Sequence, residues 1–205
     1  MIPAFLYGTA WKEERTAGLV RSALEVGFRG IDTANQRRHY FEQAVGDAVA
    51  EALGAGRLTR TDLFLQTKFT YAAGQDHRLP YHPHADFPTQ VRQSFASSLE
   101  HLRTDYIDSY VLHGPSVGRG LSEADYQVWK EMEALCREEK TQFIGVSNVS
   151  RDQLRMLAEA ALIPPRFVQN RCFAVSSWDR EVREFCAAQK SRTSRSQWFT
   201  AKQRF

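Results

Sequence analysis

The sequence contains few cysteines and no long apolar run. Its three cysteines, Cys136, Cys172 and Cys186, are odd in number and lack C-x-x-C spacing. We therefore expect reduced structural thiols rather than a disulfide or metal framework. Residues 1–15 show neither a basic leader nor an apolar stretch long enough for a signal peptide or a membrane span. These absences predict a cytoplasmic protein that does not associate with membranes.

A basic stripe is also missing from most of the chain. The net charge is +3, from 27 Lys and Arg against 24 Asp and Glu. Residues 190–205 (KSRTSRSQWFTAKQRF) hold five of the basic residues and no acidic one, which leaves 22 basic against 24 acidic residues, a net charge of −2, in residues 1–189. A nucleic-acid groove needs a concentrated basic surface. We therefore expect no nucleic-acid partner.

What the sequence does have is a repeated strand–helix pattern. Six short apolar runs with little alternation are each followed by an amphipathic segment. The runs cover residues 4–7, 28–31, 63–65, 106–112, 143–146 and 167–168, and the amphipathic segments cover residues 13–26, 42–53, 89–102, 123–137, 151–162 and 180–189. Such runs are typical of parallel strands buried on both faces. The pattern predicts an α/β fold, either a (β/α) barrel or a doubly wound sheet.

Polar residues at the strand ends favour the barrel. The predicted strands end on Gly8-Thr9, Asp32, Lys68, His113, Ser147-Asn148 and Gln169. In a (β/α) barrel the carboxyl ends of all strands meet at one mouth, so these residues would come together. A doubly wound sheet would instead have a G-x-G-x-x-G turn after its first strand, where this chain reads GTAWKEE.

Four residues expected near that mouth could act on a carbonyl group. Asp32 and Lys68 could form an ion pair, which by itself suits a structural role as well as a catalytic one. A lysine ammonium near Tyr40 would stabilise the phenolate and make the tyrosine a better acid. His113 could donate a hydrogen bond to a carbonyl oxygen. Together the four could polarise and protonate a carbonyl, whereas the reductant must come from a cofactor.

The motifs around these residues resemble those of the aldo-keto reductase family. The segments GTAWK, GFRGIDTA, HYFEQAVG, LFLQTKF, DYIDSYVLHGP, GVSN and FVQNRC come in the order and spacing of that family, over about Ile2 to Gln189. The resemblance implies a (β/α)8 barrel of the TIM type and NADPH, or less often NADH, as cofactor. It also implies reversible reduction of an aldehyde or ketone, the small-molecule partner, to an alcohol.

The resemblance further implies a role for each residue of the site. Tyr40 would be the proton donor, Lys68 and Asp32 would tune its acidity, and His113 would orient the carbonyl. The cofactor-binding residues would be Thr9, Trp11, Asp32, Ser147, Asn148 and Gln169.

The position of the tyrosine departs from the usual family pattern. In much of the family it follows the aspartate by five residues and precedes a glutamate by three. Here Arg37 occupies the first of these positions and His39 the second, while Tyr40 lies two residues before Glu42. We prefer Tyr40, because some members resemble this H-Y-x-E form and because a phenol suits the lysine–aspartate pair.

The resemblance ends at Gln189. The family would continue with two further βα units, which supply much of the grip on the cofactor, whereas residues 190–205 show no strand-like run and no amphipathic helix. We expect about six βα units in residues 1–189, a basic disordered tail in residues 190–205, and a truncated reductase that is weakly active or inactive. The alternative is a non-catalytic interaction protein on the same scaffold.

A metal site is not expected. His77, His82 and His84 lie in a proline-broken loop, residues 76–86, where no helix or strand fixes their geometry. Long loops at a barrel mouth shape specificity, so we expect this loop to influence substrate choice.

Overall fold

The computed structural model describes residues 2–192 and 199–203, and these form one parallel sheet covered by helices. The elements are β1 (Leu6–Gly8), α1 (Thr16–Glu25), β2 (Gly30–Asp32), α2 (Glu42–Gly54), β3 (Phe64–Phe69), α3 (Phe87–Leu102), β4 (Ile107–Leu112), α4 (Glu123–Arg137), β5 (Thr141–Ser147), α5 (Arg151–Ala160), β6 (Phe167–Arg171), α6 (Arg180–Arg192) and β7 (Phe199–Gln203).

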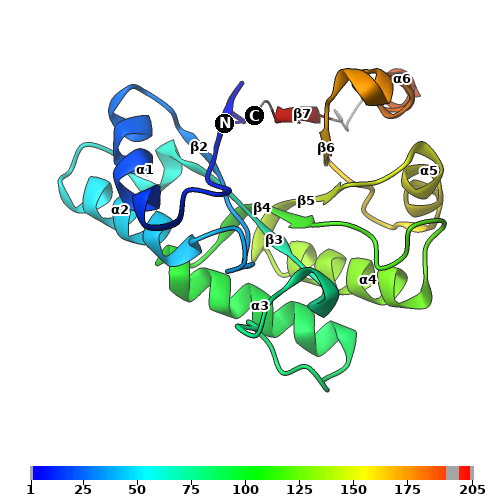
Figure 1. Cartoon of the computed structure of the whole chain (residues 1–205), viewed down its shortest axis with the longest axis horizontal. Helices are drawn as coiled ribbons and strands as arrows, with labels where there is room; N and C mark the ends of the chain where they lie inside the picture. Colours follow the sequence, from blue (N-terminus) through cyan, green and yellow to red (C-terminus); the bar gives the residue numbers. More distant parts are fainter. Residues whose placement is uncertain (1, 193–198, 204–205) are drawn as a thin grey trace.

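The strands pair in the order of the sequence, which confirms the barrel type. Each strand from β1 to β7 lies parallel to the next. A doubly wound sheet would reverse its strand order part-way across. Helices α1 to α6 follow one another around the outside of the curled sheet (Figure 1). The arrangement is part of a (β/α)8 barrel.

Strands β2, β3 and β4 are buried on both faces, as their apolar runs predict. Every residue of β2, β3 and β4 is buried. Residues on the outer face, such as Leu65, Tyr110 and Ile144, belong to the main hydrophobic core beneath the helices. The inner face carries aromatic residues near the amino ends of the strands and polar residues near their carboxyl ends, at the mouth of the barrel. The side-chain direction therefore alternates along each strand even though the exposure does not.

Three phenylalanines form the floor of the barrel interior. Phe64, Phe143 and Phe167 lie near the amino ends of β3, β5 and β6, with ring centroids 5.6 to 6.4 Å apart. Edge-to-face and offset contacts at this spacing are favourable for aromatic rings. The floor leaves only the carboxyl end of the barrel for a polar site.

Helix starts depend on caps that periodicity does not reveal. The sequence predicts a helix over residues 89–102, whereas α3 begins at Phe87 because the Asp86 carboxylate accepts a hydrogen bond from the Thr89 amide at 2.9 Å. Helices α4 and α5 begin with capping boxes at Ser122 and Ser150. Each cap satisfies amides that would otherwise lack a partner.

One glycine allows α2 and α3 to pack closely. A Cβ atom at Gly46 would lie 1.8 Å from the backbone oxygen of His101. Only glycine fits at this contact, because the obstructing atom belongs to the backbone of α3 and has no freedom to move aside.

The structure differs from the prediction for residues 190–205. Helix α6 continues to Arg192, and residues 199–203 form β7, which pairs with β6 from Phe167↔Phe199 to Arg171↔Gln203. The sequence shows no strand pattern there. Backbone pairing with the edge of β6 does not require an apolar run, so a strand can form without that signal. The predicted disorder of residues 193–198 and 204–205 lies outside the described residues.

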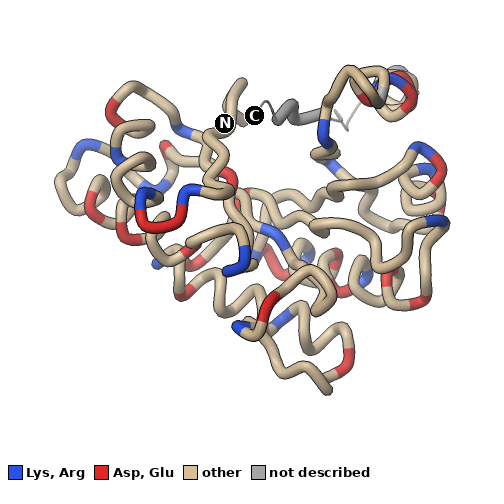
Figure 2. The backbone as a smooth tube through the Cα atoms, viewed as in Figure 1, with Lys and Arg blue, Asp and Glu red and all other residues tan. Residues whose placement is uncertain are grey.

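Charged residues of both signs are spread over the outer helices and loops (Figure 2). Among the described residues, no helix is both long enough and apolar enough to span a bilayer.

Candidate active site

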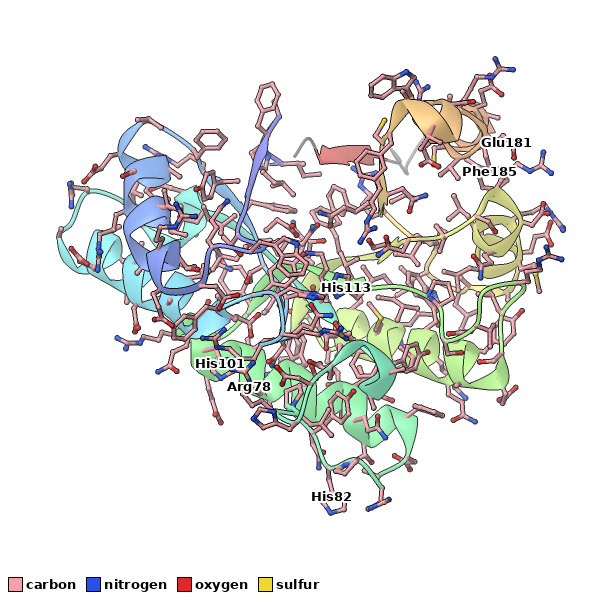
Figure 3. All side chains as sticks on the ribbon, in the orientation of Figure 1. Arg78, His82, His101, His113, Glu181 and Phe185 are labelled. Carbon is pink, nitrogen blue, oxygen red and sulfur yellow. The ribbon has the colours of Figure 1, made fainter. Side chains whose placement is uncertain are left out.

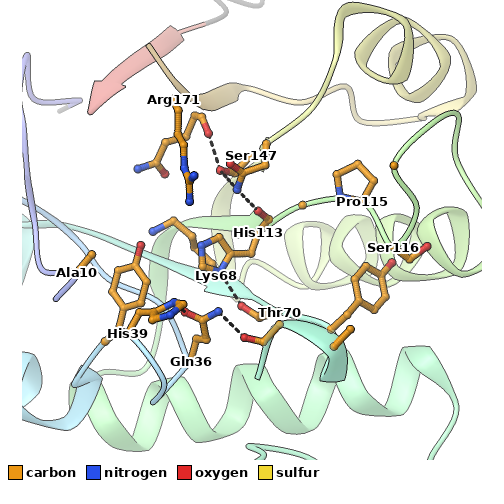
Figure 4. Close-up of a pocket in the computed structure, with 18 of the residues that line it drawn as sticks. Ala10, Gln36, His39, Lys68, Thr70, His113, Pro115, Ser116, Ser147 and Arg171 are labelled. Carbon is orange, nitrogen blue, oxygen red and sulfur yellow. Dashed lines mark hydrogen bonds between the residues drawn. The ribbon is translucent and has the colours of Figure 1, made fainter. Parts of the chain in front are cut away.

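The carboxyl ends of the strands surround one cavity of about 470 Å³. Of the residues predicted for the site, those that line it are Trp11, Tyr40, Lys68, His113, Ser147, Asn148 and Gln169. Side chains from β3, β5 and β6 and from the loops after β2 and β4 point into it (Figure 4). Residues far apart in the sequence therefore meet, as a barrel mouth requires.

Asp32 and Thr9 lie beneath the cavity and do not line it. The Thr9 hydroxyl donates to the backbone oxygen of Asp32 at 2.9 Å, and Thr9 is fully buried. Thr9 therefore supports the strand end that carries Asp32. Trp11, which is 58% exposed, reaches the cavity rim.

Asp32 and Lys68 form a buried ion pair. Lys68 Nζ lies 2.6 Å from Asp32 Oδ1 and donates to the Thr33 backbone oxygen at 2.7 Å, and both side chains are at most 2% exposed. Burial lowers the pKa of Lys68, but the Asp32 carboxylate and Tyr40 outweigh it, so the net pKa is above the usual value. Lys68 therefore keeps its charge at neutral pH.

Tyr40 lies directly above this pair. Lys68 Nζ is 4.9 Å from the centroid of the Tyr40 ring, and the His113 ring is 5.8 Å away in an edge-to-face contact. Tyr40 is 6% exposed, so little water surrounds it. The phenol, the ammonium and the imidazole thus share one side of the cavity.

His39 is held elsewhere on the rim. Its ring stacks on Trp11 at 3.9 Å between centroids, and its Nδ1 lies 2.9 Å from Gln36 Oε1. The Trp11 amide also donates to the His39 backbone oxygen at 2.8 Å. These contacts turn His39 toward the loop after β1, whereas Tyr40 faces Lys68.

His113 is uncharged in the folded protein. Burial, followed by the charge of Lys68, lowers its pKa to about 3. The Thr70 hydroxyl lies 2.7 Å from Nδ1. When that hydroxyl donates to Nδ1, Nε2 carries the proton and can donate to a ligand. Figure 3 shows His113 at the centre of the strands, while His82 projects from the tip of the loop before α3.

Ser147, Asn148 and Gln169 continue the cavity lining from His113. The Ser147 hydroxyl donates to the Gln169 backbone oxygen at 2.5 Å, and the Asn148 amide donates to the His113 backbone oxygen at 2.7 Å. The Gln169 side-chain amide donates to Asp32 Oδ2 at 3.0 Å. The predicted cofactor amides are therefore cross-linked to the predicted acid–base residues.

Sequence reasoning misses Gln66, Thr70 and Arg171. Gln66 donates to Asp32 Oδ1 at 2.8 Å and to Gln169 Oε1 at 2.9 Å, so it joins the two across the barrel. A signal for the first two was available, since residues 66, 68 and 70 share one face of a strand by its period of two. Arg171 likewise shares a face of β6 with Gln169, two residues before it.

A second buried carboxylate, Glu42, lies behind the site at the start of α2. It accepts hydrogen bonds from the Thr67 hydroxyl and from Ser98 Oγ, and His101 Nδ1 is 3.1 Å away. The hydrogen bond to Glu42 raises the pKa of His101 against the opposing effect of burial. His101 is thus part of a structural pair that joins α2 to α3.

We expect this pair to make stability pH-dependent. Because the folded-state pKa of His101 is raised, its contribution is fully present below the unfolded pKa of 6.5 and is lost as pH rises through the folded pKa. His101→Gln should therefore lower the free energy of unfolding more at about pH 6 than at about pH 8 in urea titrations. His77→Gln, at an exposed position, is the control. Equal losses at both pH values for His101→Gln would contradict the pairing.

The predicted loop histidines show no metal-like arrangement. The rings of His82 and His84 are 5.8 Å apart, and in the described part of the chain no group of three or more His, Cys, Asp or Glu side chains could hold a metal ion.

Comparison with known proteins places this site in a family. The profile of the Aldo/keto reductase family matches residues 6–192. This chain belongs to the aldo/keto reductase family. Its relatives include NADPH-dependent codeinone reductase 1-4 of Papaver somniferum, 33% identical over 91% of this chain and 59% of the relative. Deoxymugineic acid synthase 1 of Zea mays is 32% identical over 91% of this chain and 60% of the relative.

Solved aldo-keto reductases share the fold. One from the silkworm Bombyx mori has a TM-score of 0.73 and 25% identity over 92% of this chain and 57% of its own. Another silkworm enzyme, solved in complex with NADP, has a TM-score of 0.68 and 27% identity over 83% of this chain and 54% of its own. This aldo/keto reductase chain thus spans between a half and two thirds of the length of these relatives.

Proposed function

We propose that the chain reduces an aldehyde or ketone to an alcohol with NADPH as the hydride donor. The observation that carries the proposal is the buried Lys68–Asp32 pair beneath Tyr40, with an uncharged His113 beside the same ring. Family membership and the NADP-linked relatives support it.

The cavity residues fit the nicotinamide end of such a cofactor. A carboxamide offers one donor group and one acceptor, and Ser147, Asn148 and Gln169 present hydroxyl and amide groups to the cavity. Ser147 lies on the same side of the cavity as His113 (Figure 4). We therefore assign these three residues to the carboxamide and the exposed ring of Trp11 to the cavity wall.

The protein's own residues would handle the proton. When bound, NADPH supplies a hydride to the carbonyl carbon. As the carbon–oxygen π bond breaks, Tyr40 gives its hydroxyl proton to the carbonyl oxygen. Lys68 stabilises the phenolate that remains, and Asp32 holds Lys68 in place. His113 donates from Nε2 to the carbonyl oxygen and so fixes its direction toward Tyr40.

Equilibrium titration and turnover test the proposal together. NADPH should quench tryptophan fluorescence, since Trp11 lies on the cavity rim, and NADH is titrated in parallel to rank the two cofactors. Oxidation of NADPH should then depend on a neutral probe such as 4-nitrobenzaldehyde. A stable stoichiometric complex with another protein, with no carbonyl-dependent NADPH oxidation, would instead indicate a non-catalytic interaction protein.

A further inference from the structure

Arg171 is a cation at the cavity mouth for which the proposed chemistry has no use. It is the last residue of β6, two residues after Gln169, and lines the cavity. Figure 4 shows its side chain reaching from β6 toward the side of the cavity that holds Lys68 and His113. Among the described residues it makes no ion pair.

The charges around the cavity leave Arg171 uncompensated. The described residues that line the cavity include two cations, Lys68 and Arg171, and no carboxylate. Lys68 is neutralised by Asp32 at 2.6 Å. His113 is uncharged, and burial together with the charge of Arg38 lowers the pKa of His39.

Two carboxylates near the rim have arginine partners, and Asp125, behind the cavity wall, accepts hydrogen bonds from Tyr71 and Ser116. Glu13 binds Arg37 at 3.2 Å, and Asp76 binds Arg78. Neither offsets Arg171. Because like-signed walls concentrate ions of the opposite charge, the mouth attracts an anion.

We propose that Arg171 binds the carboxylate of the carbonyl substrate, so that the substrate class is aldehydes and ketones that carry an acid group. This inference rests on the proposed function. A guanidinium binds a carboxylate through two parallel hydrogen bonds. The substrate would place its carbonyl at Tyr40 and His113 and its acid group at Arg171, while its apolar body contacts Trp11, Tyr71 and Val117, which line the same cavity.

A phosphate of the cofactor is the other anion that Arg171 could bind. The position of Arg171 favours the substrate. It lines the same cavity as Tyr40 and His113, and its side chain reaches toward Lys68 and His113 (Figure 4). A carboxylate a few bonds from the carbonyl would therefore reach it.

A matched pair of probes distinguishes a substrate carboxylate from a cofactor phosphate as the anion that Arg171 binds. 4-Carboxybenzaldehyde and methyl 4-formylbenzoate differ only in the charge of the acid group. Their affinities are measured by equilibrium titration, and kcat/KM is measured with NADPH, for the wild type, Arg171→Gln, Arg171→Lys and Arg155→Gln. Arg155 is the control because it lies on α5, is half-exposed and pairs with Glu159 away from the cavity. NADPH affinity is measured for all four proteins, and circular dichroism checks their folding.

We expect the wild type to prefer the acid over the ester by about tenfold or more, the effect of one charge-assisted hydrogen bond. Arg171→Gln should bring the two probes to within about threefold of each other. Arg171→Lys should keep part of the preference, and Arg155→Gln all of it. The affinity for NADPH should stay the same in all four proteins.

Three results would overturn the inference. They are an unchanged acid-to-ester ratio in Arg171→Gln, a wild type without preference, and a loss of NADPH affinity in Arg171→Gln with the ratio retained. The last would assign Arg171 to a cofactor phosphate. Reduction of both probes at equal rates would leave the reductase proposal standing without this one. Acid-selective, Arg171-dependent binding without turnover would support the anion site and contradict the reductase proposal.

Discussion

Tyr40→Phe is expected to reduce kcat for carbonyl reduction by about 10²- to 10⁴-fold, the contribution of a positioned proton donor. Phenylalanine keeps the ring that packs against His113 and above Lys68, so the variant loses the hydroxyl and little else. Turnover of 4-nitrobenzaldehyde with NADPH measures the loss. Cofactor titration by tryptophan fluorescence should show unchanged affinity, which would place the defect in the chemical step.

His39→Gln is the matched control. His39 stacks on Trp11 and contacts Gln36, and this places its ring on the rim rather than above Lys68. We expect kcat within about tenfold of the wild type, because the proposed proton transfer does not involve this ring. The opposite pattern, with Tyr40→Phe active and His39→Gln inactive, would assign the proton donor to His39.

Asp32→Ala is expected to lower the free energy of unfolding by about 3–5 kcal/mol, because it leaves the Lys68 charge buried without its partner. The loss also removes the acceptor of hydrogen bonds from Gln66 and Gln169. Urea unfolding followed by circular dichroism gives the difference. A loss below about 1 kcal/mol would be typical of an exposed pair and would contradict the burial of this one.

The pH dependence of the same variant has a definite sign. In the wild type the pKa of Lys68 is raised, so its contribution is fully present below 10.5 and is lost only as pH rises through the folded pKa. Without Asp32, burial lowers the folded pKa below the unfolded one. The unfolded chain then binds the proton more tightly, and the variant should gain stability relative to the wild type between neutral pH and about pH 9.

A double variant, Asp32→Leu with Lys68→Met, separates loss of the partner from loss of packing. Apolar residues of similar volume often replace a buried pair at little cost. We expect the double variant to recover most of the stability that Asp32→Ala loses while remaining inactive. Failure to recover stability would mean that the hydrogen bonds from Gln66 and Gln169 to Asp32, rather than the buried charge, dominate the loss.

Much of the fold could be predicted because its signals are local. Apolar runs followed by amphipathic segments indicate βα units wherever they occur, and a polar residue at the end of such a run lies at the carboxyl edge of the sheet whatever its neighbours are. This applies to Asp32, Lys68 and His113. The start of α3 and the strand β7 escaped prediction, since one depends on the Asp86 side chain and the other on backbone pairing with β6.

The sequence by itself determined the α/β class, the family resemblance and the strand-end positions of the charged pair, because each follows from spacing along the chain. Only the tertiary structure decided which residues meet above that pair. The separation of Tyr40 from His39 depends on a loop held by contacts to Trp11 and Gln36. The uncompensated charge of Arg171 likewise emerges only when all residues that line the mouth are brought together. Electrostatic balance is a sum over neighbours in space, and the order of residues in a chain does not contain it.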